Sequence, residues 1–281
     1  MKEPVRTPRA WLRLLGVAVL ALLGTALVSG IWAALLTLNL HSSTRWPWSA
    51  LAMGALLALA WNYFAGHGWP RSGAAARARG LRANRIPSAF FADALIAGTL
   101  ALIAIAGLWI VAFQTGLMQG NRLPDYSPYP WPMIVATLAM AAIVGGVSEE
   151  AAFRGYFQGA LERLVSAPIA IGATALLLAP GHAATQGFAL PTFVFYLVVD
   201  AMLGTIAYLA NSILPGIVVH SIGLAIFFAL IWPFDTARVA GVDALRDHWF
   251  WIHAGQVVLF SILALRAFRR LAARPRSQGD A

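Results

Sequence analysis

Long apolar stretches, each about the length of one transmembrane helix, most constrain the fold of this 281-residue chain. A helix needs roughly 20 apolar residues to cross a bilayer core about 30 Å thick. We predict about eight such spans, at residues 11–38, 47–66, 89–113, 131–163, 167–186, 190–210, 212–231 and 249–268. The expected fold is therefore an all-α polytopic membrane protein with about eight transmembrane helices, with the lipid bilayer as its first partner.

The composition excludes a soluble domain of the same length. Hydrophobic residues make up 60% of the chain and charged residues only 11%, whereas about a quarter of the residues in a soluble domain are charged. So few polar residues cannot cover the surface of a soluble core. The chain has no cysteine, which excludes disulfides, thiolate metal ligands and a cysteine nucleophile.

The basic residues indicate how the helices are oriented. If the N-terminus is inside and the spans alternate, the inner side collects far more basic residues than the outer side, and this bias places both termini in the cytoplasm. The inner residues are Lys2, Arg6, Arg9, Arg13, Arg71, Arg77, Arg79, Arg82, Arg85, Arg163, Arg266, Arg269, Arg270, Arg274 and Arg276. The outer residues are Arg45, Arg122, Arg238 and Arg246.

The net charge of +9 is carried by short basic clusters between the apolar stretches. This placement is typical of a membrane protein and argues against nucleic acid as a partner. The first stretch is about twice as long as the apolar region of a signal peptide, so we expect it to remain as a membrane helix. The preference for Arg over Lys and the abundance of Ala favour a bacterial protein, located in the inner membrane.

Three ionisable residues, Glu149, Glu150 and Arg154, lie within the apolar stretch 131–163. A charged side chain near the bilayer centre costs about 2.5–3.5 kcal/mol, so such residues usually face a polar cavity and have a function. In an α-helix Glu150 and Arg154 lie on one face and can form an ion pair. Glu149 is then the carboxylate left for proton transfer. A solvated helix end near the headgroups is the alternative.

His182 is expected at the same depth as Glu149. If spans 131–163 and 167–186 form an antiparallel hairpin, both residues lie about 16 positions, or about 24 Å, from the turn. His220, near the middle of the seventh span, is the third candidate. Two chemistries fit these residues. Glu149, His182 and His220 could ligate a divalent metal such as Zn²⁺, with an open position for water. Alternatively, Glu149 and His182 activate water directly and His220 stabilises the oxyanion.

Three motifs in this order resemble the CAAX protease and bacteriocin-processing family, also called the type II CAAX prenyl endopeptidase or Abi family. The resemblance covers about residues 131–230. The motifs are Glu149-Glu150-x-x-x-Arg154, then His182, then Ser212-Ile213-Leu214-Pro215 followed by His220.

This resemblance implies an eight-helix intramembrane endopeptidase that acts on a membrane-associated protein or peptide. In such an enzyme Glu149 and His182 activate water, and His220 helps to bind the oxyanion. Glu150 and Arg154 support the site or engage the substrate.

The family resemblance also divides the chain into three parts. Residues 1–130 hold about three transmembrane helices and a basic cytoplasmic loop at 67–88. Residues 131–230 are the CAAX-protease-like catalytic core. Residues 231–281 contain the last transmembrane helix and a basic C-terminal tail.

The chain departs from the family pattern at two positions. Leu178 replaces the usual Phe four residues before His182, and Leu224 replaces the usual Asn or Asp four residues after His220. Because losing one oxyanion donor can cost about 10²–10³-fold in rate, a catalytically weakened member acting as an immunity or scaffold protein is one alternative. A transporter that uses the buried charges as an ion relay is another. We expect Asp200, in the sixth span, to pair locally, with compensation for Leu224 as the alternative.

Overall fold

The computed structural model describes residues 7–120, 125–186 and 189–274, without the side chains of residues 183–186. These residues form helices and no strand. The helical segments are α1 Pro8–His41, α2 Trp48–Phe64, η1 Arg71–Gly73, α3 Ala74–Leu81, α4 Ser88–Gln114, α5 Trp131–Glu149, η2 Glu150–Gln158, α6 Gly159–Leu161, α7 Ala167–Gln186, α8 Leu190–Ala210, α9 Leu214–Ile226, η3 Phe227–Ile231, η4 Trp232–Ala237, η5 Gly241–Arg246 and α10 His248–Ala273.

Each predicted span coincides with a helix, and the all-α polytopic fold is confirmed. Within the described residues, 6 helical segments are long and apolar enough to cross a membrane. Two others, Trp48–Phe64 and Ala167–His182, are apolar but shorter. The count of eight transmembrane helices therefore stays a prediction.

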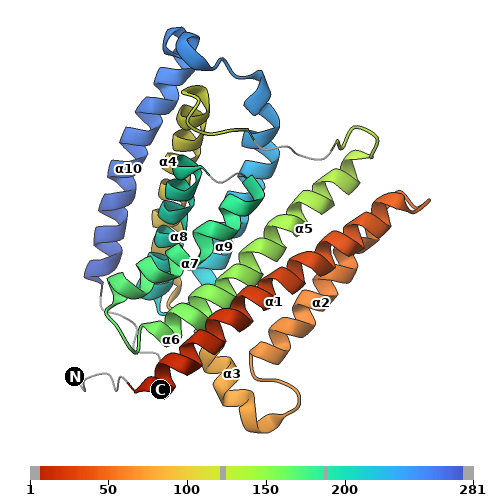
Figure 1. Cartoon of the computed structure of the whole chain (residues 1–281), viewed down its shortest axis with the longest axis vertical. Coiled ribbons are helices and arrows are strands. Elements are labelled where there is room, and N and C mark those ends of the chain that lie inside the picture. The colour runs from red at the N-terminus through yellow and green to blue at the C-terminus, as the bar shows by residue number, and fades with distance from the viewer. Residues whose placement is uncertain (1–6, 121–124, 187–188, 275–281) are drawn as a thin grey trace.

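The helices form two groups that meet at one interface (Figure 1). Helices α1, α2 and α5 pack on one another in the first group, and α4 packs along α10 at the far side of the second. Helix α5 packs against α9 and thereby joins the groups. Gly145 and Gly146 of α5 allow a close approach to α9. A Cβ at Gly145 would lie 2.6 Å from Cδ1 of Leu224, and one at Gly146 would lie 3.2 Å from the carbonyl oxygen of Ile217.

The basic segment at 67–88 is more ordered than the solvated loop we expected. It contains α3, in which Leu81 is buried, and Arg82 directly after it is buried too. Arg82 forms an ion pair of 2.9 Å with Glu162. The segment folds because its polar groups find partners within the protein and α3 packs on η2. A Cβ at Gly155 of η2 would lie 2.6 Å from the carbonyl oxygen of Leu81, so only glycine allows this approach.

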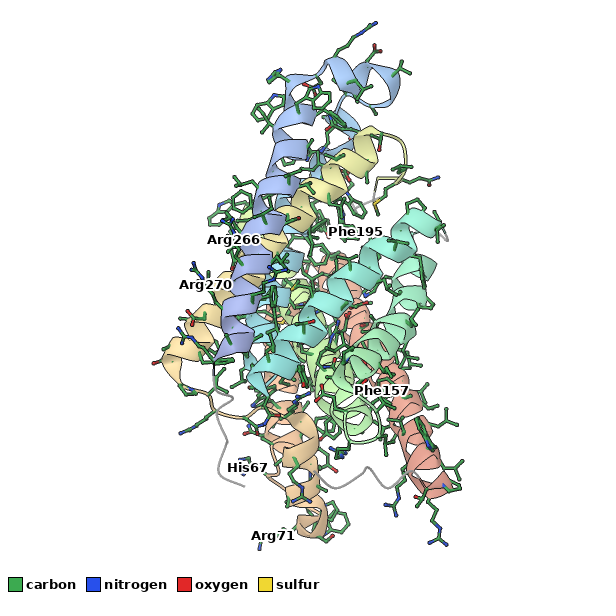
Figure 2. All side chains as sticks on the ribbon, turned by 90° about the vertical axis from the view of Figure 1, so that its left-hand side faces the viewer. His67, Arg71, Phe157, Phe195, Arg266 and Arg270 are labelled. Atoms are coloured by element: carbon green, nitrogen blue, oxygen red, sulfur yellow. The ribbon has the colours of Figure 1, made fainter. Side chains whose placement is uncertain are left out.

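Helix α1 begins, and α10 ends, at the end of the molecule where α3 lies (Figure 1). Figure 2 shows His67 and Arg71 at this same end. The arrangement agrees with the predicted gathering of basic residues on one side of the membrane. Which side is cytoplasmic stays a prediction. The predicted positions of Lys2, Arg6, Arg122 and Arg276 lie outside the described residues.

Candidate active site

The acidic pair lies where the backbone changes from α-helix to π-helix. Glu149 is the last residue of α5, and Glu150 is the first residue of the π-helix η2, which ends at Gln158. We expected one continuous α-helix here. π-helical turns are rare and often occur at functional sites. The change alters the directions in which Glu150 and Arg154 project relative to a regular α-helix.

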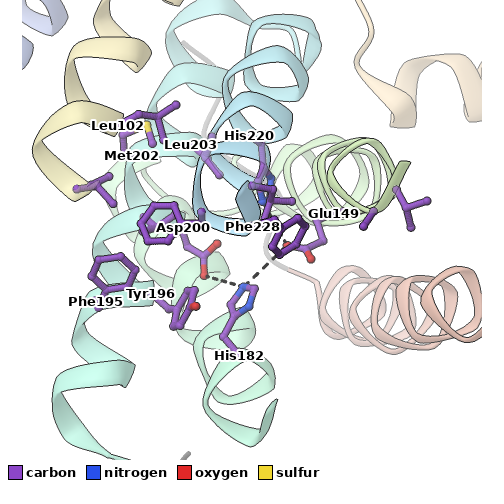
Figure 3. Close-up of a pocket in the computed structure, with 18 of the residues that line it drawn as sticks. Leu102, Glu149, His182, Phe195, Tyr196, Asp200, Met202, Leu203, His220 and Phe228 are labelled. Carbon is purple, nitrogen blue, oxygen red and sulfur yellow. Dashed lines mark ion pairs between the residues drawn. The ribbon is translucent and has the colours of Figure 1, made fainter. Parts of the chain in front are cut away.

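Glu149 faces the imidazoles of two histidines from two other helices (Figure 3). Its Oε2 atom lies 3.8 Å from Nε2 of His182 on α7 and 3.9 Å from Nε2 of His220 on α9. Oε2 is buried and accepts no hydrogen bond from a described residue. The ring of His182 stacks on Tyr196, with the ring centroids 4.3 Å apart. The predicted convergence of Glu149, His182 and His220 is therefore present, whereas their catalytic roles stay predictions.

Glu150 orients His220 from the side opposite to Glu149. Nδ1 of His220 and Oε1 of Glu150 are hydrogen-bonded at 3.1 Å. When Glu150 is ionised it can only accept, and Nδ1 of His220 is then the donor. This bond fixes the ring so that Nε2 faces Glu149.

Arg154 pairs with two acids, not one. Its Nη1 atom lies 3.5 Å from Oε1 of Glu150, as the i,i+4 spacing predicted. Its shorter contact is a hydrogen bond of 2.5 Å from Nη2 to Oδ1 of Asp200 on α8. The side chains of Arg154 and Glu150 are fully buried, and that of Asp200 is 2% exposed. A charge buried this completely needs such partners, since an unpaired one is very costly.

Asp200 is a further acidic residue of the site, and the sequence contained no indication of its partners there. We expected it to pair locally, and its partners instead lie on η2 and α7. Oδ1 binds Arg154 from η2, while Oδ2 lies 3.9 Å from Nε2 of His182 (Figure 3). The sequence did contain an indication that Asp200 belongs to the site, because it is the sole charged residue of the apolar α8 sequence. Its partners depend on how α8 packs against η2 and α7.

The cluster holds more negative than positive charge when both histidines are neutral. Glu149, Glu150 and Asp200 supply three carboxylates, and Arg154 supplies one guanidinium. With both histidines neutral, the formal charge of the cluster is therefore negative by two. A cluster in an apolar protein interior is most stable near neutrality.

A cavity of about 350 Å³ opens beside these groups. Its polar groups come mainly from Glu149, His182, Asp200 and His220, together with Ser29. Most of the remaining wall is apolar, and Leu224 belongs to it. The position at which the family usually has Asn or Asp is therefore occupied by an apolar side chain here. The aromatic side chains in the wall are Trp32, Phe195, Tyr196, Phe227, Phe228 and Trp232.

The metal site predicted at Glu149, His182 and His220 stays a prediction. No group of three or more His, Cys, Asp or Glu side chains among the described residues is placed to hold a metal ion. Ligand atoms in a tetrahedral zinc site lie about 3.4 Å apart, as bonds of about 2.0–2.2 Å require. Oε2 of Glu149 is farther than this from both histidines, at 3.8 and 3.9 Å. We therefore derive no catalytic step through a metal.

Residues 130–226 match the family model described as type II CAAX prenyl endopeptidase Rce1-like. The match covers about a third of the chain and contains Glu149, Glu150, Arg154, His182 and His220. Comparison with curated proteins and with solved structures gives no significant match. The region that folds into α5, η2 and α7 to α9 is therefore similar to an Rce1-like type II CAAX prenyl endopeptidase domain.

Proposed function

We propose that the protein is an intramembrane endopeptidase that hydrolyses peptide bonds of a membrane-associated protein or peptide. One observation carries the proposal, namely the convergence of Glu149 with Nε2 of His182 and His220 beside a mostly apolar cavity. The Rce1-like domain supports a membrane-embedded protease at the family level. The apolar wall favours a substrate segment that is itself apolar.

Water is the nucleophile in the proposed reaction. The 3.8 Å gap between Oε2 of Glu149 and Nε2 of His182 is too long for a direct hydrogen bond, but one water molecule can bond to both atoms. Glu149 takes a proton from this water while the oxygen of the water bonds to the scissile carbonyl carbon. The C–N bond of the resulting tetrahedral intermediate then breaks, and the proton passes from Glu149 to the leaving amine.

His220 is the proposed donor to the oxyanion. Its Nδ1 hydrogen is used by Glu150, so Nε2 can donate only in the doubly protonated imidazolium. The carboxylates on both sides of the ring stabilise that form. A charged donor beside the developing oxyanion also gives stronger stabilisation than a neutral one. This arrangement supplies an oxyanion donor in a chain whose Leu224 cannot donate.

Arg154 and Asp200 are proposed as positioning residues. Arg154 holds Glu150 and Asp200 at fixed places in the buried network. Through Glu150 it fixes the ring of His220, and through Asp200 it places a second carboxylate beside His182. Asp200 thereby orients His182 and balances its charge when the ring is protonated.

The proposal is tested with purified protein in liposomes and a library of membrane peptides, with the products identified by mass spectrometry. Wild type is expected to cleave members of the library, and His182→Gln is expected to lose most of this activity because the bridging water loses one partner. His253→Gln on α10 is the matched control, since His253 lies outside the cavity and bonds to Gln256. Equal cleavage by wild type and His182→Gln would contradict the proposed role of His182.

Metal removal is a separate test. The proposed reaction uses only side chains of this chain, so dialysis against a chelator is expected to leave the cleavage rate unchanged. The measurement compares rates before dialysis, after it, and after adding Zn²⁺ back. A loss of cleavage that Zn²⁺ restores would replace direct water activation with a metal site formed by rearrangement of Glu149, His182 and His220.

A catalytically weakened scaffold or immunity protein is the second candidate. Leu224 favours it, because this side chain lines the cavity where the family usually has an amide. The buried network around Arg154 would then serve only to hold the helices together.

A further inference from the structure

A second cavity, of about 440 Å³, lies between α1, α2 and the junction of α5 with η2. It shares no lining residue with the cavity beside Glu149. Its size falls within the range of about 300–1,000 Å³ that is usual for ligand pockets. The wall is formed by Val17, Leu20, Ala21, Gly24, Thr25, Leu27, Val28, Leu57, Ala60, Trp61, Phe64, Leu81, Val147, Ser148, Ala151, Ala152 and Tyr156.

This wall is suited to a hydrocarbon chain. Its hydroxyl groups belong to Thr25, Ser148 and Tyr156, and all donate to main-chain carbonyl oxygens. Thr25 donates to Ala21 at 2.9 Å, and Ser148 donates to Val144 at 2.6 Å. Tyr156 donates to the carbonyl oxygen of Arg77 at 2.8 Å. Nearly all of the remaining wall is aliphatic or aromatic, so burial of apolar surface is the main recognition available.

The cavity borders the lipid-facing side of α1. Leu20 and Leu27, which belong to its wall, are 71% and 64% exposed. Gly24, between them, is exposed as well. A chain from the surrounding bilayer can therefore enter sideways between α1 and α2.

The end of the cavity near α3 adjoins a strongly basic segment. Leu81, the last residue of α3, belongs to the wall. Residues 66–92 contain five arginines and no acidic residue. Two of these arginines are engaged within the protein. Arg77 donates to main-chain carbonyls, and Arg82 pairs with Glu162.

The other arginines are Arg71, Arg79 and Arg85. They are exposed and form no ion pair with a described residue. Arg71 lies at the same end of the molecule as His67 (Figure 2). Helix α3 packs on the cavity wall, because the ring of Tyr156, which lines the cavity, lies against Gly80. An apolar cavity beside unpaired cations matches a ligand with a hydrocarbon chain and an anionic head.

We propose that this cavity binds one acyl chain of an anionic phospholipid, whose headgroup is attracted by the positive charges of Arg71, Arg79 and Arg85. The lipid comes from the leaflet next to α3. The site is independent of the proposed peptidase activity. Its occupant would contact Val147, Ser148 and Ala151, which flank Glu149 and Glu150. These contacts would stabilise the junction of α5 with η2.

The cavity is tested by filling it. A Cβ at Gly24 or at Gly16 would meet no atom within 4 Å, and only Gly24 lines the cavity. The proteins are reconstituted with equal parts phosphatidylglycerol and phosphatidylcholine, extracted, and examined for retained lipid by native mass spectrometry. Wild type and Gly16→Trp are expected to retain phosphatidylglycerol in preference, and Gly24→Trp is expected to lose it.

The headgroup site is tested by variants that leave the cavity intact. Arg71→Gln with Arg79→Gln should reduce the preference for phosphatidylglycerol by about fivefold per arginine. Arg266→Gln with Arg270→Gln on α10 is the matched control, and its preference should equal that of wild type. Equal retention of the two lipids by wild type would overturn the proposal. Undiminished retention of phosphatidylglycerol by Gly24→Trp would also overturn it. The same holds if the two double arginine variants show an equal preference for phosphatidylglycerol.

Discussion

Replacing Glu149 by glutamine is expected to lower the cleavage rate by about 10²–10⁴-fold, the usual contribution of a general base. Glutamine has nearly the volume of glutamate but cannot take the proton from water. Folding should be unaffected, because Oε2 of Glu149 accepts no hydrogen bond from a described residue. The measurement is the initial cleavage rate in liposomes at matched concentrations of folded protein, together with the midpoint of thermal unfolding.

Glu162→Gln is the matched control for this prediction. Glu162 pairs with Arg82 outside the cavity, and their side chains are 14% and 8% exposed. This substitution should lower stability and leave the rate per folded molecule unchanged, which is the reverse of the pattern for Glu149→Gln. A Glu149→Gln protein that cleaves as fast as wild type would show the mechanism to be wrong. If wild type cleaves no substrate and Glu149→Gln retains the biological phenotype, the scaffold function replaces the peptidase.

Replacing Arg154 by leucine is expected to lower the free energy of unfolding by about 3–5 kcal/mol, the usual cost of breaking a buried ion pair by removing one partner. The substitution leaves Glu150 and Asp200 buried without their cation. Denaturant titration of the purified protein measures the change. Arg246→Leu is the control, because Arg246 and Asp243 form an exposed pair whose loss should have no measurable effect.

Glu150→Ala tests how much Glu150 contributes to the stability of the same buried network. If Glu150 were the sole partner of Arg154, as the i,i+4 spacing alone suggests, this change would leave Arg154 as an unpaired charge. The structure shows otherwise, because Arg154 keeps its 2.5 Å hydrogen bond to Asp200. Glu150→Ala should therefore destabilise less than Arg154→Leu, while it frees the ring of His220 and slows cleavage. A larger loss of stability for Glu150→Ala would show that Asp200 is not the main partner of Arg154.

The sequence alone determined the membrane fold and the main candidates for the site. Each predicted span coincides with a helix because the bilayer imposes a minimum length and an apolar composition on any helix that crosses it. The cost of charge in an apolar segment singled out Glu149, Glu150 and Arg154. The hairpin between α5 and α7 placed His182 level with Glu149, since rise per residue is nearly constant in helices.

Only the tertiary structure decided which of these groups meet. The pairing of Arg154 with Asp200 and of His220 with Glu150 joins helices that are far apart in the chain. Helical periodicity describes neighbours within one helix but not the rotation or tilt of one helix against another. The π-helix at Glu150–Gln158 changes the periodicity itself. The cavities and the docking of α3 likewise depend on close approaches at Gly80, Gly145 and Gly155, because only glycine lets a neighbouring chain pack this closely against the backbone.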